Sequence, residues 1–171
     1  MIAGLVLTDN EEEDSALAFV SDDKVETFSI KDTQEIVEKI KEKGPEILAA
    51  DIGLEQRGED LTHQEEELKE KGYSFTPTHT ETKNVKRLQA IKAVLDRDME
   101  MPPNFIRFDP FITAEELAID EENGFESYGI DTSDLSSAKE FDALLGAVTA
   151  RFYEQNQFTE LGVVIPGKVE E

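Results

Sequence analysis

The sequence predicts an α/β fold built on a mixed β-sheet, and three observations carry this prediction. Three short apolar segments, at 2–8, 16–20 and 24–30, follow one another with only charged turns between them, as antiparallel strands do. A helical pattern then leads into the nearly continuous apolar run at 47–52, the order expected of a crossover helix and a buried parallel strand. The last long helix carries one apolar face, so it is expected to pack on the sheet.

The boundaries of each element follow from caps and periodicity. Asp32 is placed to cap a helix with one apolar stripe, and Gly44-Pro45 ends that helix. The rest of the chain continues to alternate between helical and extended patterns. In order, it predicts a polar helix capped by Thr62 and Glu65, a helix at 81–98, a strand at 104–109, a short helix at 114–119, a loop at 123–134, a helix opened by Ser137 and Glu140, and a strand at 161–165.

The chain is strongly acidic, and its length fits one domain covering residues 1–171. It contains 40 Asp and Glu against 17 Lys and Arg, for a formal net charge of −23. The acids are spread along the chain, which favours a solvated surface adapted to a salty cytoplasm, because high salt screens their repulsion. The alternatives are an ordinary acidic protein and a protein that binds a basic partner.

Several classes of site are excluded by what the sequence lacks. Without Cys there is no disulfide, thiolate zinc site or cysteine nucleophile. The sequence has no Gly-rich phosphate loop or nucleophile elbow, and His63 and His79 lack the spacing of a zinc pair. No apolar run is long enough to span a bilayer. We therefore expect a cytoplasmic protein with no membrane partner, either a monomer or a homodimer.

Asp51 is the first candidate for a functional residue. It lies at the carboxyl end of the most hydrophobic strand, where an isolated carboxylate costs several kcal/mol to desolvate. Ligand and metal sites of α/β sheets gather at such strand ends. The alternative is that Asp51 caps the turn that follows at Gly53.

Asp142 is the second candidate, and it lies in the first turns of the last long helix. Gly146 and Thr149 share its side of this helix, and alanines occupy positions 143, 147 and 150 nearby. Such small residues let a helix lie close to a sheet, which would bring Asp142 toward the strand ends. The alternative is an acid favoured near a helix amino terminus by the helix dipole.

Four stretches of the chain resemble the ribonuclease-H-like fold, and specifically a family of small, largely uncharacterised prokaryotic predicted nucleases. They are IAGLV at 2–6, similar to the opening strand that usually reads Gly-Ile-Asp; AADIGL at 49–54, similar to an Ile-Asp-x-Pro-Leu strand end; the charged segment 65–72 with Phe75 and Pro77, similar to a helix and Gly…Pro-Pro turn; and FDALLGAVTA at 141–150 with Gly162 and Ile165-Pro166, similar to an Asp-Ala-x-x-x-Ala-x-Thr-Ala helix and its closing segment. The resemblance covers nearly the whole chain, and the last stretch is the most specific.

This resemblance implies a five-stranded sheet in mixed order with carboxylates grouped at one end. In active members of the fold these hold two Mg²⁺ or Mn²⁺ ions, one activating water and the other stabilising the leaving oxygen of a phosphodiester. Carried over residue by residue, Asp51 and Asp142 stand at two of the expected catalytic and metal-ligating positions. The resemblance also implies RNA or DNA as the partner.

Two departures from the family's pattern indicate a degenerate site. The first-strand position that is usually Asp is Val6 here, and the Glu expected in the fifth strand is Arg107. Asp9 and Asp109 are the acids that could ligate a metal instead, Asp9 through a bulge and Asp109 by strand parity. A remodelled site could also use Glu65.

Five of the 17 basic residues fall in a single predicted helix. Among them, Lys83, Lys86 and Arg87 are the candidates for contacting a nucleic-acid backbone. The alternative is charge balance on an exposed helix face. Arg107, expected beside Asp51, is either a binding site for an anionic group or an ion pair that replaces the lost metal.

Two functional hypotheses follow. The first is a nuclease that acts on nucleic-acid phosphodiesters with Mg or Mn as cofactor and a degenerate carboxylate site. The alternative is a catalytically inactive ribonuclease-H-like protein from a salt-adapted organism, which binds nucleic acid, a small anion or a protein partner.

Overall fold

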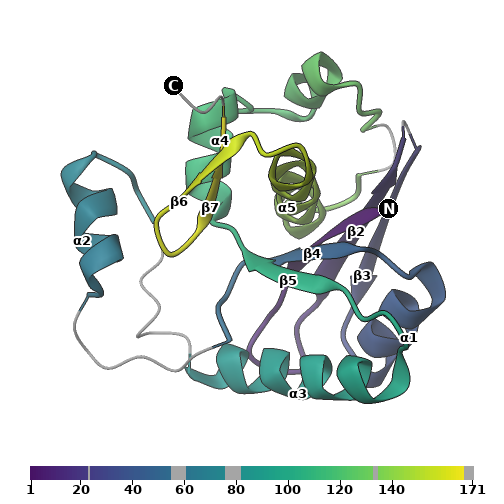
Figure 1. Cartoon of the computed structure of the whole chain (residues 1–171). Coiled ribbons are helices and arrows are strands. Elements are labelled where there is room, and N and C mark those ends of the chain that lie inside the picture. The colour runs from purple at the N-terminus through teal and green to yellow at the C-terminus, as the bar shows by residue number, and fades with distance from the viewer. Residues whose placement is uncertain (23, 55–60, 76–81, 133–134, 168–171) are drawn as a thin grey trace.

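A five-stranded sheet forms the centre of the molecule (Figure 1). The computed structural model describes residues 1–22, 24–54, 61–75, 82–132 and 135–167, so His79 and Pro77 lie outside the described residues. The strands are β1 (Ile2–Val6), β2 (Ser15–Ser21), β3 (Lys24–Ile30), β4 (Ile47–Ala50) and β5 (Asn104–Arg107), in the spatial order β3-β2-β1-β4-β5. The first three pair antiparallel, whereas β4 is parallel to both β1 and β5. The predicted mixed sheet is confirmed.

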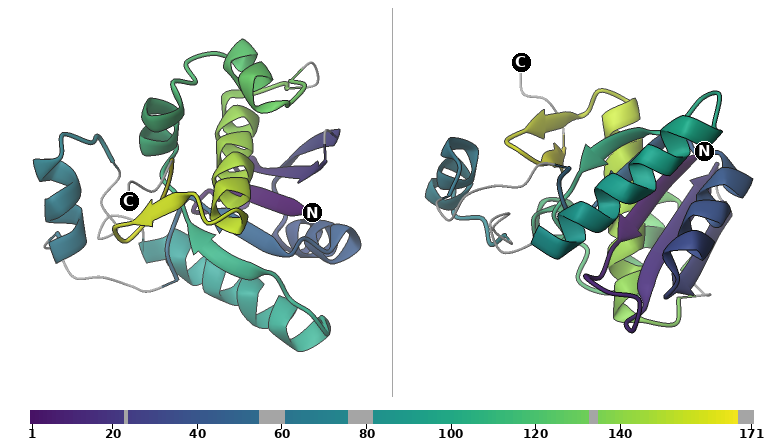
Figure 2. Two further views of the ribbon diagram at one scale, coloured as in Figure 1. Left: turned by 45° about the horizontal axis from the view of Figure 1, so that its top comes forward. Right: turned by 90° about the horizontal axis from the view of Figure 1, so that it is seen from below.

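Helices cover both faces of this sheet. Two helices, α1 (Thr33–Lys43) and α3 (Thr82–Asp98), lie on one face, and α5 (Ala138–Glu154) lies on the other (Figure 2). The remaining elements are α2 (His63–Glu70), α4 (Pro110–Leu117), the 3₁₀ helix η2 (Glu122–Tyr128) and a separate two-stranded sheet of β6 (Phe158–Glu160) and β7 (Val164–Pro166). None of the helices in the described ranges combines the length and apolarity needed to cross a bilayer.

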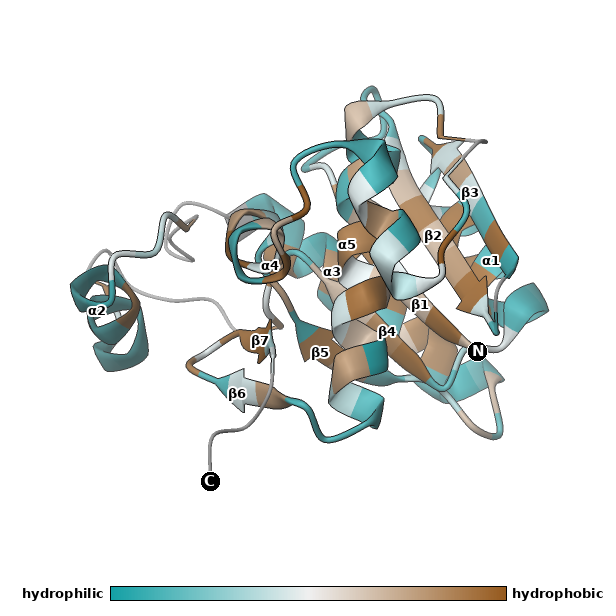
Figure 3. Cartoon of the chain, turned by 90° about the horizontal axis from the view of Figure 1, so that it is seen from above, coloured by the Kyte–Doolittle hydropathy of each residue, from teal (hydrophilic) through white to brown (hydrophobic). Residues whose placement is uncertain are grey.

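Burial on both faces explains why the central strands are almost continuously apolar. Along β1, Ala3 and Leu5 pack with α1 and α3, while Ile2 and Val6 pack with α5. Side chains alternate between the faces of a strand, so a strand covered twice needs apolar residues at every position. Most of β1, β2 and β4 is accordingly hydrophobic, whereas β3 at the edge of the sheet is more polar (Figure 3).

Helix α5 approaches the sheet closely because glycines face each other at the contact. A Cβ added to Gly4 would lie 1.9 Å from the carbonyl oxygen of Ala143 and 2.6 Å from the backbone nitrogen of Ala147. A Cβ on Gly146 would lie 2.6 Å from the ring of Phe108. The small face predicted for this helix therefore does let its backbone lie against β1.

Several predicted caps are present. The Asp32 side chain accepts a hydrogen bond from the backbone N–H of Gln34 at 2.7 Å, and Gly44 ends α1 in the left-handed conformation. Thr62 and Glu65 form a reciprocal capping box at the start of α2, and the Ser137 hydroxyl caps α5.

Three elements differ from the predictions. Helix α4 begins at Pro110 rather than 114, because Pro suits the first turn of a helix and Asp109 caps it. A 3₁₀ helix occupies the first half of the loop expected at 123–134, of which residues 133–134 lie outside the described ranges. The predicted final strand at 161–165 is a turn followed by β7, which pairs with β6 and not with the main sheet.

Candidate functional site

Asp51 lies where β1 and β4 end side by side. The backbone N–H of Asp51 donates to the carbonyl of Leu5 at 3.1 Å, which extends the parallel pairing of these strands by one residue. The Oδ1 atom of Asp51 accepts a hydrogen bond from the backbone N–H of Leu7, also at 3.1 Å. The carboxylate is therefore held in place by the end of the neighbouring strand.

Val6 occupies the position beside Asp51. Leu5 pairs with Ala50, so the next residues of the two strands, Val6 and Asp51, are neighbours. Ala49 and Val6 both pack with α5, and strand alternation directs Asp51 toward the same face. An apolar residue thus stands where the family resemblance implies a second carboxylate.

The environment of Asp51 favours its neutral form. Partial burial raises the pKa of this carboxyl from 3.8 to about 7, against the opposing effect of the hydrogen bond from Leu7. The negative charge of Asp142 raises the pKa further, and the positive charge of Arg107 lowers it. The structure therefore brings these three sequence-predicted residues within electrostatic reach of one another.

Asp142 and Asp109 form the other half of this acidic group. Burial raises the pKa of Asp142, and the charge of Asp109 raises it further. Asp109 is buried, and its Oδ1 atom accepts hydrogen bonds from the backbone N–H groups of Phe111 at 2.9 Å and Ile112 at 3.4 Å. This carboxylate caps α4. The sequence predicted instead that Asp109 is the last residue of a strand, but β5 ends at Arg107.

The two remaining candidate acids have other surroundings. Asp9 is exposed in the turn between β1 and β2, where its Oδ1 accepts a hydrogen bond from the Asn10 side chain at 2.8 Å. Glu65 accepts a hydrogen bond from the backbone N–H of Thr62 in its capping box. Its helix, α2, lies beyond the β6–β7 hairpin, away from the main sheet (Figures 1 and 3).

The residues present do not fit the two-metal site that the resemblance implies. Within the ranges that the structure describes, no group of three or more Asp, Glu or His side chains is arranged to hold a metal ion. Hard divalent cations take oxygen ligands, and in proteins carboxylates supply the negative charge among them. Here Val6 supplies no ligand, and the Oδ1 atom of Asp109 is engaged by the α4 backbone. The chemistry of this set is that of a partly buried, partly protonated acidic group.

Arg107 lies at the end of β5, paired with Ala50. Alternation along β5, with Phe105 toward α1 and α3 and Ile106 toward α5, directs Arg107 to the face opposite α5. Its positive charge nevertheless acts on Asp51. Arg107 therefore offsets a small part of the negative charge of the site from the other face of the sheet.

Arg87 binds the protein's own loops. Its guanidinium donates to the Thr33 hydroxyl at 2.9 Å, to the Thr8 carbonyl at 3.0 Å and to the Lys31 carbonyl at 2.7 Å. It also reaches the Ser15 hydroxyl at 3.2 Å. These contacts tie α3 to the β1–β2 turn and to the start of α1. No local pattern of residues indicates this role, because the acceptors come from two separate turns.

Replacing Arg87 with Ala is therefore expected to destabilise the fold by about 2 to 4 kcal/mol, because several partly buried acceptors lose their donor. The neighbouring Lys86 is exposed, so Lys86→Ala is the matched control and is expected to change stability by about 0.5 kcal/mol or less. Urea denaturation followed by circular dichroism measures both. Equal stabilities for the two variants would contradict the structural role of Arg87.

Comparisons with known proteins agree on the fold. The sequence matches no protein-family model and no curated protein. Among solved structures, it is similar to Thermus thermophilus RuvC in complex with a Holliday junction substrate, with a TM-score of 0.54, 18% identity and coverage of 96% of this chain and 98% of that one. It is also similar to a second structure of Thermus thermophilus RuvC, with a TM-score of 0.51, 15% identity and the same coverage.

At this level of identity the likeness concerns the fold. It agrees with the strand order, the parallel β1–β4–β5 half of the sheet and the helices on both faces. The chain therefore has the ribonuclease-H-like fold.

Proposed function

We propose that this chain is a non-catalytic ribonuclease-H-like protein that binds a protein partner. The observation that carries this proposal is the composition of the strand-end site. Val6 stands beside Asp51 where a carboxylate would be needed, and Asp109 caps the first turn of α4. A site of this kind supports neither the two cations nor the activated water that phosphodiester hydrolysis requires in this fold.

The surface charge supports a protein partner over a nucleic acid or a small anion. Affinity for a phosphate backbone grows with the number of phosphates that Lys and Arg neutralise. In α3, Arg87 is bound to its own chain, and Lys92 and Arg97 form ion pairs with acids of the same helix. Of the three residues predicted to contact a nucleic-acid backbone, Lys83 and Lys86 are exposed. Two lysines on a chain of net charge −23 provide little attraction for a phosphate backbone.

The second candidate is a Mg- or Mn-dependent nuclease of the predicted family of small prokaryotic nucleases. Two observations favour it. One similar structure is described as a complex with a Holliday junction substrate. In addition, Asp142 lies within electrostatic reach of both Asp51 and Asp109, so three acids adjoin the strand ends.

A cleavage assay separates the two candidates. Labelled single-stranded, duplex and four-way-junction DNA, and RNA of the same sequences, are incubated with the protein and millimolar Mg²⁺ or Mn²⁺. We expect no cleavage, and no loss of any residual binding when Lys83 and Lys86 are both changed to Ala. Cleavage that needs the metal and disappears in Asp51→Asn would establish the nuclease and overturn the proposal.

A further inference from the structure

Strand β3 forms one edge of the main sheet. All seven of its residues pair with β2 in one unbroken antiparallel register, and within the described ranges no other strand follows β3 in the order of the sheet. In an edge strand, alternate residues direct their backbone N–H and C=O groups away from the sheet. A long, regular edge of this kind is a template on which another extended chain can pair.

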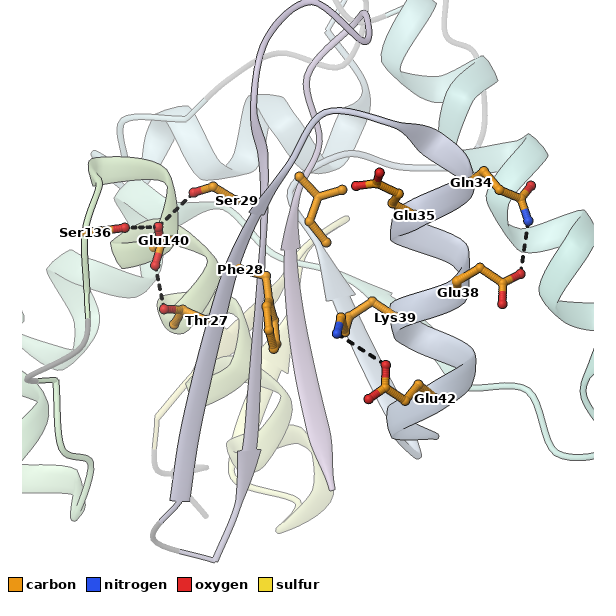
Figure 4. A pocket seen from close by; sticks show the side chains of 11 residues that line it. Thr27, Phe28, Ser29, Gln34, Glu35, Glu38, Lys39, Glu42, Ser136 and Glu140 are labelled. Atoms are coloured by element: carbon orange, nitrogen blue, oxygen red, sulfur yellow. Dashed lines mark hydrogen bonds and ion pairs between the residues drawn. The ribbon is translucent and has the colours of Figure 1, made fainter.

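A cavity of about 640 Å³ runs along this edge. Figure 4 shows β3 between two walls, with Phe28 directed toward α1 and with Thr27 and Ser29 directed toward Glu140 at the start of α5. The edge of β3 therefore lies in a groove that helices flank on both faces of the sheet. An added strand in this groove would be in contact with side chains above and below.

The α5 wall holds β3 in place. The buried carboxylate of Glu140 accepts hydrogen bonds from the Thr27 hydroxyl at 2.5 Å, the Ser29 hydroxyl at 2.8 Å and the Ser136 hydroxyl. Burial raises the pKa of Glu140, but these hydrogen bonds outweigh it and lower the pKa below its ordinary value. Glu140 thus stays ionised and fixes the edge strand, which reduces the ordering cost of pairing with it.

The α1 wall is acidic. Glu35, Glu38 and Glu42 are exposed, and their spacing of three and four residues places them on one side of α1 facing the groove. We call these three glutamates the acidic stripe. The side chain of Phe28 projects from β3 toward the stripe, and the Lys39 ammonium lies 4.5 Å from the centroid of its ring. Lys39 also pairs with Glu42 at 3.2 Å. Glu38 lies 3.6 Å from the Lys41 ammonium, which Asp98 shares, and Lys43 pairs with Glu26. Five acids thus face three lysines, which leaves a modest excess of negative charge beside the exposed strand edge.

We propose that the edge of β3 binds an extended, basic peptide segment of a partner protein, which adds to the sheet as a further strand and directs alternate Lys or Arg side chains to the acidic stripe of α1. This inference rests on the proposed protein-binding function and names its surface. Residues two apart on a strand are about 6.7 Å apart, and the stripe spans about 10 Å. Two or three alternating basic residues therefore match it.

Charge complementarity favours this occupant over a second copy of the chain. Two copies would bring together surfaces of net charge −23 each, and in buffer of low ionic strength such repulsion opposes self-association. A basic strand would gain both the main-chain hydrogen bonds of strand addition and the attraction of Glu35, Glu38 and Glu42.

The test uses a labelled peptide, acetyl-Lys-Thr-Lys-Val-Lys-Thr-Lys-amide, and fluorescence anisotropy. Two further peptides carry N-methyl groups, one on all the Lys residues and the other on the Thr and Val residues. Because alternate residues of a strand present their N–H groups to opposite edges, one methylated peptide is expected to bind like the parent and the other about tenfold more weakly or worse. Equal affinities for the two would show that charge alone drives binding and would overturn the proposal.

A pair of matched triple variants locates the site on the full-length protein. Changing Glu35, Glu38 and Glu42 to Gln is expected to weaken parent-peptide binding about tenfold. Changing Glu66, Glu67 and Glu70 of α2 to Gln removes the same charge elsewhere and is expected to leave the affinity unchanged. Equal losses in both, or sedimentation that shows a dimer unable to bind peptide, would overturn the proposal. Either outcome is independent of the cleavage assay, which tests the proposed function separately.

Discussion

Replacing Gly4 with Ala is expected to cost about 4 kcal/mol or more of folding stability, or to prevent folding. Overpacking of a core typically costs about 1 to 3 kcal/mol when side chains can move aside. Here the new Cβ would meet the backbone of α5, at 1.9 Å from the Ala143 carbonyl oxygen and 2.6 Å from the Ala147 nitrogen. The whole helix must shift to accommodate the new Cβ. The expected loss of stability is therefore larger than that of most point mutations, which cost about 0.5 to 3 kcal/mol.

Gly53→Ala is the matched control, because it adds the same methyl group just beyond the end of β4, the strand that pairs with β1. Its Cβ would lie 3.7 Å from the Arg107 Cδ, an ordinary van der Waals contact. We expect the free energy of unfolding of this variant, measured by urea denaturation and circular dichroism, to lie within about 1 kcal/mol of the wild-type value. A Gly4→Ala protein as stable as Gly53→Ala would show that α5 does not lie against β1 as described.

Replacing Asp51 with Asn is expected to stabilise the protein by about 2 to 4 kcal/mol at pH 8 and to have little effect near pH 4. The pKa of Asp51 in the folded protein is about 7, above its ordinary value of 3.8. Between these values the folded state binds a proton that the unfolded state has lost, so the stability of the wild type falls as the pH rises from 4 to 7. Asn removes the charge and keeps an acceptor for the Leu7 N–H.

Urea unfolding of both proteins at a series of pH values measures this effect. At each pH, the free energy of unfolding of the wild type is subtracted from that of the variant. This difference isolates the effect of Asp51, because the other carboxylates titrate in both proteins. Asp14→Asn removes one exposed charge and is expected to give a difference that is small and flat with pH. A flat difference for Asp51→Asn as well would contradict the burial of this carboxyl between β1 and β4.

Local signals predicted most of the sheet and its helices. Strand β3 matches its predicted range at 24–30, and Asp32, Thr62 and Ser137 cap the helices that they were expected to cap. These features depend on neighbouring residues, which a sequence displays directly. Helix α4 was predicted to begin too late because Pro110 was interpreted as a boundary, although Pro also suits the first turn of a helix.

The candidate site was predictable only in part. The topology places the end of β4 near α5, and the structure brings Asp51 and Asp142 within electrostatic reach. The partners of Arg87 and Glu140 were not predictable, because each binds residues from distant turns or strands. Glu140 carried the pattern of a capping box, and its bonds to Thr27 and Ser29 depend on how α5 crosses β3. Adaptation to high salt stays a prediction from composition.

The proposed function requires that the strand-end acids of this ribonuclease-H-like chain bind no catalytic metal. Titration with Mn²⁺ in concentrated KCl, followed by the electron paramagnetic resonance of free Mn²⁺, tests it most directly, because the salt suppresses loose binding to the acidic surface. We predict the same free-ion signal for the wild type, Asp51→Asn and Asp142→Asn. One or two tightly bound ions per wild-type chain, lost in either variant, would contradict it.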